Sequence, residues 1–354
     1  MILKINPLKP EPDKLKIAAD AIKRGRLVAF PTETVYGLGA DAFNENACKQ
    51  IFLAKGRPQD NPLIVHVNSI KMADKLGVFP AEYKPLLNDI WPSPITFVVK
   101  KRATLPNVVT ASLDTVALRM PAHPVALALI NEAGVPIAAP SANLSGKPSP
   151  TEAKTVMKDI GDKAEIILDA GQTFFGLEST VIDLQSFTIL RPGPFTPDEI
   201  ARKFGKKPNL LSYTTYPKDR PTSPGMKYRH YAPDKPLFLF SGNKEELVTL
   251  VNKLDAHFCF LGSEETCNHI YSVKAYKLSL GSYKNAYEIA KNLFSTLRAI
   301  DNYSAKFAIS ESFDTQGIGL AIMNRLNKAA GGNTFSNIDE LDKLLRKSHV
   351  TEES

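Results

Sequence analysis

Residues 27–42 read LVAFPTETVYGLGADA, and this stretch decides the fold that we predict. Its first four residues are apolar, which is typical of a buried strand, and Pro31 ends that strand. Hydroxyls, a carboxylate and a phenol follow, and Gly37 and Gly39 then allow the backbone to turn sharply. So many different polar groups after one strand indicate a ligand-binding loop on an α/β sheet, because loops at strand ends often carry function.

The same glycines also fit the pattern G-x-G-x-x-G/A of dinucleotide-binding folds. That pattern needs its first glycine directly after the strand, whereas six residues separate Phe30 from Gly37. The next apolar strand, residues 63–67, is followed by asparagine and serine rather than by an acid that could bind a ribose. A nicotinamide-dependent oxidoreductase is therefore the weaker alternative.

The composition is that of a globular protein with two domains. The chain has 354 residues, of which 43% are hydrophobic and 23% charged. We find neither a membrane-spanning apolar run nor the apolar core of a signal peptide. Cys48, Cys259 and Cys267 predict neither a disulfide framework nor a zinc site. We therefore expect a cytoplasmic protein that does not contact a membrane.

The positive charge is concentrated in one segment. Residues 202–235 contain nine Lys or Arg and two acids, a difference that equals the formal net charge of +7 of the whole chain. Such a segment can attract nucleotide phosphates or RNA. A solvated charged linker explains it equally well.

Short apolar strands alternate with amphipathic helices over the first 200 residues, which predicts a mixed-sheet α/β domain. The expected helices are residues 13–24, 45–55 (capped by Asn44), 124–132 and 151–160. The expected strands are residues 27–30, 63–67, 95–100, 116–119, 135–139, 166–169, 180–184 and 188–191.

Prolines then interrupt the pattern, and we expect a basic linker over 205–234 between domains at 10–204 and 235–347. Apolar strands resume at 236–240, 258–261 and 307–310, with helices over 244–254, 283–299 and 318–329. This alternation predicts a smaller, doubly wound, Rossmann-like C-terminal domain.

Polar and cationic side chains follow several of the predicted strands. Lys55 and Arg57 flank one glycine and can face the same anion, and Arg119 ends a strand where it needs an anionic partner. The small side chains of residues 141–146 would let a ligand approach the backbone. If these groups converge on one cleft, that cleft suits a polyanion together with a small zwitterion. We find no P-loop, no H-E-x-x-H and no G-x-S-x-G.

In their order, these motifs resemble those of the YrdC-type threonylcarbamoyl-AMP synthases, in the longer, two-domain branch. The resemblance covers about residues 10–333 and is carried by PTETVYGLG at 31–39, KGRP at 55–58, NP at 61–62, WPSPIT at 91–96, RMP at 119–121, SANLSG at 141–146, STV at 179–181, RPG at 191–193 and SPGMKYRHYAP at 223–233. Ser93, and Ile95 in place of an expected leucine, are the small departures.

The resemblance implies that L-threonine, bicarbonate and ATP are converted to threonylcarbamoyl-AMP and pyrophosphate. The product would serve threonylcarbamoyladenosine formation beside the tRNA anticodon, through a downstream tRNA threonylcarbamoyl-transferase machinery. A direct tRNA contact is a further expectation. Magnesium would arrive with ATP and be held mainly by its phosphates, with no metal site from the protein.

By the same resemblance we expect defined roles for individual residues. The threonine-binding residues would be Thr34, Tyr36, His66, Arg119, Ala139 and Ser179. The ATP-binding residues would be Lys55, Arg57, Asn61, Thr115, Ser141, Asn143, Ser149, Arg191, Tyr228 and His230. Lys55, Arg57 and Thr34 would be the catalytic residues.

The segment 223–231, which is basic and aromatic, would fold over the cleft as a lid that excludes water. The alternative to a synthase is a non-catalytic RNA-binding module, which the basic linker favours and the dense polar motifs do not.

Overall fold

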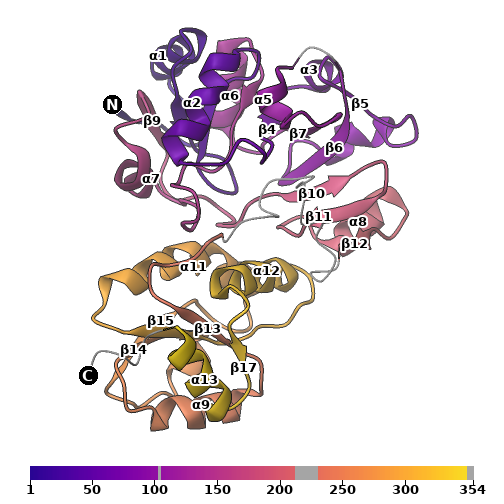
Figure 1. Cartoon of the computed structure of the whole chain (residues 1–354). Coiled ribbons are helices and arrows are strands. Elements are labelled where there is room, and N and C mark those ends of the chain that lie inside the picture. Colours follow the sequence, from indigo (N-terminus) through magenta and orange to yellow (C-terminus); the bar gives the residue numbers. More distant parts are fainter. Residues whose placement is uncertain (103–104, 212–229, 349–354) are drawn as a thin grey trace. The chain divides into compact units, whose positions relative to one another are not determined.

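The computed structural model describes residues 1–102, 105–211 and 230–348. The chain forms two compact units, each with its own sheet (Figure 1). The described parts of residues 1–145 and 149–228 make the first unit, and those of residues 146–148 and 229–354 make the second. Most of the predicted linker lies outside the described residues, so its boundaries stay a prediction.

A 12-stranded sheet of parallel and antiparallel strands forms the first unit. Its strands are β1 (Ile2–Lys4), β2 (Val28–Phe30), β3 (Gly37–Asp41), β4 (Ile64–His66), β5 (Gly77–Val78), β6 (Ile95–Lys101), β7 (Thr115–Arg119), β8 (Ile137–Ala138), β9 (Ile166–Asp169), β10 (Thr180–Asp183), β11 (Thr188–Arg191) and β12 (Asn209–Leu210). Their order is β1-β9-β2-β3-β8-β4-β7-β6-β10-β11-β12, with β5 paired to β6. The predicted mixed-sheet α/β fold is confirmed.

The helices of this unit bury two separate apolar clusters. They are α1 (Pro12–Lys23), α2 (Glu45–Lys55), α3 (Ile70–Asp74), η1 (Lys84–Leu86), α4 (Leu87–Ile90), α5 (Asn107–Thr110), α6 (Pro124–Ala133), α7 (Ala153–Ile160) and α8 (Pro197–Phe204). Val28 and Phe30 join the cluster of α1 and α6, whereas Leu27 and Ala29 join that of α2 and α7. Adjacent residues thus enter different clusters, as expected for a strand whose side chains alternate between two covered faces. Asn44 caps α2 as predicted, because its Oδ1 accepts the Ala47 N–H at 3.0 Å.

The predicted sharp turn at Gly37 and Gly39 is wrong, because both residues lie within β3, antiparallel to β2. The chain reverses earlier, over residues 31–36. A Cβ at Gly39 would lie 2.6 Å from Ile137 Cγ2 and 2.7 Å from Phe30 Cε1. Close packing of neighbouring side chains against the backbone therefore requires this glycine.

Strand register brings polar residues from four segments into one row. In the parallel pair β4–β7, His66 is opposite Arg119, and in the antiparallel pair β7–β6, Arg119 is opposite Thr96. Parallel pairing of β6 with β10 sets Val181 opposite Thr96, and Ser179, two residues earlier, lies diagonally across, with its hydroxyl 2.8 Å from Thr96 Oγ1. Groups more than 100 residues apart in the sequence thus lie across neighbouring strands.

A parallel five-stranded sheet forms the second unit, which confirms the predicted doubly wound α/β domain. Its strands are β13 (Leu237–Phe240), β14 (Phe258–Gly262), β15 (Ala275–Ser279), β16 (Phe307–Ser310) and β17 (Thr334–Phe335), in the order β15-β14-β16-β13-β17. Its helices are α9 (Lys244–Lys253), α10 (Glu264–Cys267), α11 (Ala286–Ala299), η3 (Ile300–Asn302), α12 (Gly319–Ala330) and α13 (Ile338–Lys347). In Figure 1, α11 and α12 cover one face of this sheet, and α9 and α13 cover the other.

Within the described ranges, no helix combines the length and apolarity needed to cross a membrane. Cys48, Cys259 and Cys267 are buried and are not joined in disulfides.

The close approach at β3 generates a stability prediction. Gly39→Ala should lower the free energy of unfolding by about 1–3 kcal/mol, because the new methyl group overlaps Ile137 and Phe30. Gly37→Ala is the matched control, since the nearest atom to its new Cβ would be at 3.4 Å. Urea unfolding followed by fluorescence of Trp91, the only tryptophan, measures both variants. Equal losses in the two variants would contradict this explanation.

Candidate functional site

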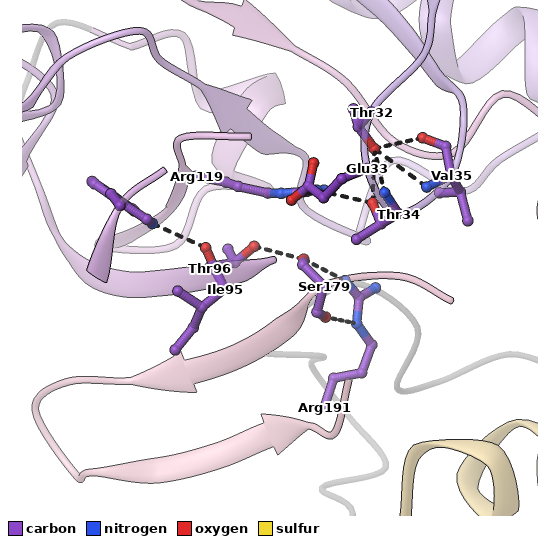
Figure 2. Close-up of polar contacts among 10 residues, drawn as sticks. Thr32, Glu33, Thr34, Val35, Ile95, Thr96, Arg119, Ser179 and Arg191 are labelled. Carbon is purple, nitrogen blue, oxygen red and sulfur yellow. Dashed lines mark hydrogen bonds and ion pairs between the residues drawn. The ribbon is translucent and has the colours of Figure 1, made fainter. Parts of the chain in front are cut away.

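The site is built around the buried guanidinium of Arg119, at the carboxyl end of β7 (Figure 2). Its Nη2 lies 2.7 Å from Glu33 Oε1 and donates to Thr34 Oγ1 at 2.9 Å. The side chains of Arg119 and Glu33 are only 4% and 6% exposed. Desolvating a charge is unfavourable unless it is paired, so this ion pair makes burial of both groups possible.

The loop after β2 is held in shape by its own hydroxyls (Figure 2). Thr32 Oγ1 donates to the Val35 carbonyl at 2.7 Å and accepts the N–H groups of Thr34 and Val35. The two threonine hydroxyls are 2.8 Å apart. Because the Thr32 proton is used on Val35, the Thr34 hydroxyl donates to Thr32 and accepts from Arg119. These bonds present Glu33 and Thr34 to Arg119.

His66 is neutral and lies opposite Arg119 in the sheet. Burial first, and the charge of Arg119 second, lower the pKa of the His66 imidazole to about 3. Among the described residues, buried His66 Nδ1 and buried Arg119 Nε have no hydrogen-bond partner. Buried polar atoms are seldom left unsatisfied, so this pair indicates a place for a small polar ligand with an acidic group.

Ser179, directly before β10, joins this region to a second buried arginine. Its hydroxyl is 2.8 Å from Thr96 Oγ1 and accepts from Arg191 Nη2 at 3.2 Å. Its carbonyl oxygen accepts from Arg191 Nε at 3.1 Å. A Cβ at Gly193 would lie 2.3 Å from Thr180 N, so only glycine permits this close approach of the two chain segments.

Lys55, the last residue of α2, organises the loop after β8. The Lys55 ammonium donates to the carbonyl oxygens of Ser141 and Asn143, and the Lys55 carbonyl accepts the Ser145 N–H at 2.8 Å. Arg57 comes directly after Gly56, whose backbone is in the left-handed conformation. Its guanidinium donates to the carbonyls of Asn61 and Pro62 at 3.3 and 3.1 Å. The structure thus brings five predicted ATP-binding residues into one connected group: Lys55, Arg57, Asn61, Ser141 and Asn143.

The remaining predicted residues lie in different surroundings. Tyr36 uses its hydroxyl on the backbone, donating to Gly171 O at 2.7 Å and accepting from Ala170 N. Ala139 donates its N–H to Ile64 O. Thr115 begins β7, at the opposite end from Arg119 and about 13 Å along the strand, so the structure does not bring these two together.

The structure also bears on three other predicted ATP-binding residues, Ser149, His230 and Tyr228. Ser149 donates to buried Glu178 Oε1 at 2.5 Å. The ring of His230 lies 5.6 Å from that of Tyr231, within the second unit. Tyr228 and most of the proposed lid, 223–231, lie outside the described residues. The roles assigned to all these side chains stay predictions.

Sequence reasoning missed several polar partners. It gave no role to Glu33, Thr96 or Glu178, because strand register and the loop fold that create their contacts are not local in sequence. His123, which caps α6 by accepting the Val125 N–H at 3.2 Å, was also missed. Burial lowers the pKa of its imidazole, with Arg119 acting in the same direction and Glu33 opposing it. The dipeptide His123-Pro124 at a helix start was the only local signal for it.

In the described ranges, no group of three or more His, Cys, Asp or Glu side chains is arranged to hold a metal ion. The cations and neutral donors instead suit anions. The arrangement can bind a carboxylate near Arg119 and phosphates near Lys55 and Arg57.

Two family models match the chain in succession. A model described as "Telomere recombination" (Sua5_yciO_yrdC) matches residues 20–193. A model described as "Threonylcarbamoyl-AMP synthase, C-terminal domain" (Sua5_C) matches residues 195–331.

Relatives and a solved structure match nearly the whole chain. A threonylcarbamoyl-AMP synthase of Pyrococcus abyssi is 45% identical over 332 residues, or 90% of this chain and 94% of the relative. The protein of that name from Bacillus subtilis is 45% identical over 90% of this chain and 93% of its own. A crystal structure of P. abyssi Sua5 complexed with L-threonine superimposes with a TM-score of 0.87 at 42% identity, covering 96% of this chain and all of the other.

The low pKa of His66 predicts a pH dependence of stability. In the unfolded chain this imidazole binds a proton below about pH 6.5, whereas in the folded chain it does so only near pH 3. Its contribution to stability is therefore lost as the pH falls from about 6.5 toward 3. Between pH 7 and 5, His66→Gln should lose about 2 kcal/mol less unfolding free energy than the unmodified protein. Urea unfolding followed at Trp91 tests this, with exposed His257→Gln as control. An unchanged pH dependence in His66→Gln would contradict it.

Proposed function

The chain belongs to the threonylcarbamoyl-AMP synthase family, and on this premise we propose that it converts L-threonine, bicarbonate and ATP into threonylcarbamoyl-AMP, pyrophosphate and water. The product would supply threonylcarbamoyladenosine formation in tRNA next to the anticodon. Such a reaction needs a binding place for an amino acid zwitterion beside one for a nucleoside triphosphate.

The observation that carries this proposal is that two buried atoms, Arg119 Nε and His66 Nδ1, have no hydrogen-bond partner among the residues that the structure describes. Glu33 and Thr34 occupy Nη2 of Arg119, so Nε can donate to the carboxylate of threonine. Neutral His66 adds a hydrogen-bonding group without a second charge. Thr34 and Ser179 would contact the remaining polar groups of threonine. Tyr36 and Ala139 are the other two residues that we assign to the threonine site.

ATP would bind through cations and small polar groups. We assign its phosphates to Lys55 and Arg57, and the other contacts to Asn61, Ser141, Asn143, Ser149, Thr115, Arg191, Tyr228 and His230. The Lys55 ammonium already holds the loop 141–145 by its carbonyls, which supports a preformed site there. Asn61 Oδ1 is buried without a hydrogen-bond partner in the described structure, and a ligand donor would satisfy it.

The chemistry proceeds without a covalent enzyme intermediate. The amine of threonine attacks the carbon of bicarbonate or of carbon dioxide, forming a carbamate and releasing water or a proton. A carbamate oxygen then attacks the α-phosphorus, the bond to the β-phosphate oxygen breaks, and pyrophosphate leaves. Arg119 would hold the threonine carboxylate, while Lys55 and Arg57 would neutralise phosphate charge, so that positioning and electrostatics supply most of the catalysis. Thr34 would orient the amino acid.

Several finer statements belong to the same proposal. Magnesium enters as part of the ATP substrate, coordinated chiefly by phosphate oxygens. The segment 223–231 closes over the bound substrates. The enzyme acts in the cytoplasm and hands its product to a tRNA threonylcarbamoyl-transferase, with the basic stretch 202–235 available for a tRNA contact. Three buried cysteines without disulfides are compatible with a reducing compartment.

The competing functions lose their support. Relatives that match nine-tenths of the chain are named as synthases, which argues against a non-catalytic RNA-binding module. The glycines of the dinucleotide-like pattern lie in β3, where they serve close packing rather than a phosphate-binding turn.

A pyrophosphate-release assay with each substrate omitted in turn tests the reaction. Release should require L-threonine, bicarbonate and ATP together, and AMP should be transferred to a threonine-containing product. Release without threonine would contradict the proposed acceptor. Absence of release, together with RNA retention at low salt, would favour the binding module.

The assigned phosphate contact predicts a specific kinetic defect. Arg57→Ala should lower kcat/KM for ATP by about 10- to 150-fold, because a hydrogen bond to a charged group contributes about 1.5–3 kcal/mol. L-Threonine affinity, measured by calorimetry, should stay unchanged. Arg102→Ala removes an exposed arginine that donates to Asp74 O and serves as the control. An equal loss in both variants would argue against a phosphate role for Arg57.

A further inference from the structure

The topology of the second unit marks a place where ligands commonly bind. From β13 the chain crosses through α9 to β14, which lies beyond β16, and from β16 it crosses through α12 to β17, which lies beyond β13. These two crossovers run in opposite directions, and right-handed connections therefore place α9 and α12 on opposite faces (Figure 1). The connections after the neighbouring strands β13 and β16 thus leave toward opposite faces of the sheet, which makes the carboxyl ends of this pair a topological switch point of an open α/β sheet.

A cavity of about 260 Å³ lies at this switch point. Gly242, Asn243 and Lys244, which follow β13, line one side, and Glu311 and Ser312, which follow β16, line the other. Tyr283, whose side chain is 47% exposed, lies at its edge. The cavity thus lies where open α/β sheets commonly bind ligands.

A buried carboxylate forms one end of the cavity. Glu311 is 4% exposed, and its Oε2 accepts the N–H and the hydroxyl of Ser263 at 2.7 and 3.1 Å. Its Oε1 accepts the Thr266 hydroxyl at 2.9 Å. These bonds fix the carboxylate, and a carboxylate has about four acceptor positions, so capacity remains for a ligand hydroxyl. Ser312 adds a second oxygen, since its own proton is used on Phe240 O.

The opposite end of the cavity suits an anion. Asn243 caps the ten-residue helix α9 by accepting the Glu246 N–H at 2.8 Å. The first N–H groups of a helix have no acceptor within the helix, so those of Lys244 and Glu245 are available to a ligand, and Lys244 also lines the cavity. Glu245 and Glu246 line an adjoining groove with the start of α13, and Glu246 Oε2 would lie 3.0 Å from a Cβ at Gly242, so one carboxylate is close to the same turn. A Cβ at Gly242 would lie 2.6 Å from Phe240 Cζ, so the chain keeps no side chain at the turn.

We propose that this cavity binds the ribose 5′-phosphate part of a small ribonucleotide. The ribose hydroxyls donate to Glu311, and the phosphate accepts from the first turn of α9 and from Lys244. An acid at the end of one strand and a glycine turn before a helix at the next are the two elements by which doubly wound folds hold a ribose and its phosphate. The base rests against Tyr283. This site is separate from the group of residues around Arg119 and does not depend on the proposed reaction.

Hydrogen–deuterium exchange of the full chain with millimolar AMP tests the proposal, because it separates this site from any AMP binding in the first unit. AMP should slow exchange in peptides covering 241–247 and 311–313. Glu311→Gln and Lys244→Glu should each weaken this protection by about tenfold or more, while protection in the first unit and pyrophosphate release stay unchanged. Asp339→Asn, an exposed change of the same charge on α13, is the control.

Further probes separate the parts of the ligand. Ribose 5-phosphate should give the same protected peptides, and adenosine, which lacks the phosphate, should protect them much less. Lys244 is exposed, so its variant keeps the test valid if Glu311→Gln impairs folding. Absence of protection in 241–247 and 311–313 with AMP, unchanged protection in both variants, or equal protection by adenosine would overturn the proposal.

Discussion

Burial of the Arg119 guanidinium constrains the whole centre of the first unit. Desolvating a charge of this kind carries a penalty of several kcal/mol, which only a nearby anion and well-placed acceptors offset. The loop after β2 must therefore fold back so that Glu33 and Thr34 reach the end of β7, and Thr32 must hold that loop in shape. Burial, with this positive charge as the smaller cause, lowers the pKa of the neighbouring His66 imidazole and keeps it neutral. Burial of this one arginine thus constrains the conformation of the loop and the charge of the substrate that can enter.

Local sequence signals predicted those elements that begin at a capping residue or end at a glycine. Asn44 and Gly56 delimit α2, and the predicted bounds 45–55 agree with the structure because a cap and a left-handed glycine act within a few residues. Strand β3 was missed, since its glycines resemble a turn until Ile137 and Phe30 are seen to pack on them. Strand β15 was also missed, because Leu278 is its only buried residue, and the two-residue strand β17 was missed because its partner β13 lies some 95 residues earlier.

The individual residues of the candidate site were predicted better than the contacts between them. The sequence indicated Arg119, Lys55 and Ser179 through their positions at element ends. It could not indicate that Ser179 meets Thr96 or that Glu33 pairs with Arg119, since those contacts depend on strand register and on a loop conformation. Family resemblance assigned roles to individual residues, whereas the pairing of β4, β7 and β6 explains why such residues can act together.

The strand order of the second unit has a consequence for its synthesis on the ribosome. β13 is the first strand of this unit to be made, yet it lies between β16 and β17, the last two. Its apolar residues, such as Phe238 and Phe240, must wait for partners some 70 and 95 residues downstream. Closing such long connections before any contact stabilises them is slow. The first unit can be complete while the second is still emerging, so nascent chains expose an unpaired apolar strand that a chaperone would recognise.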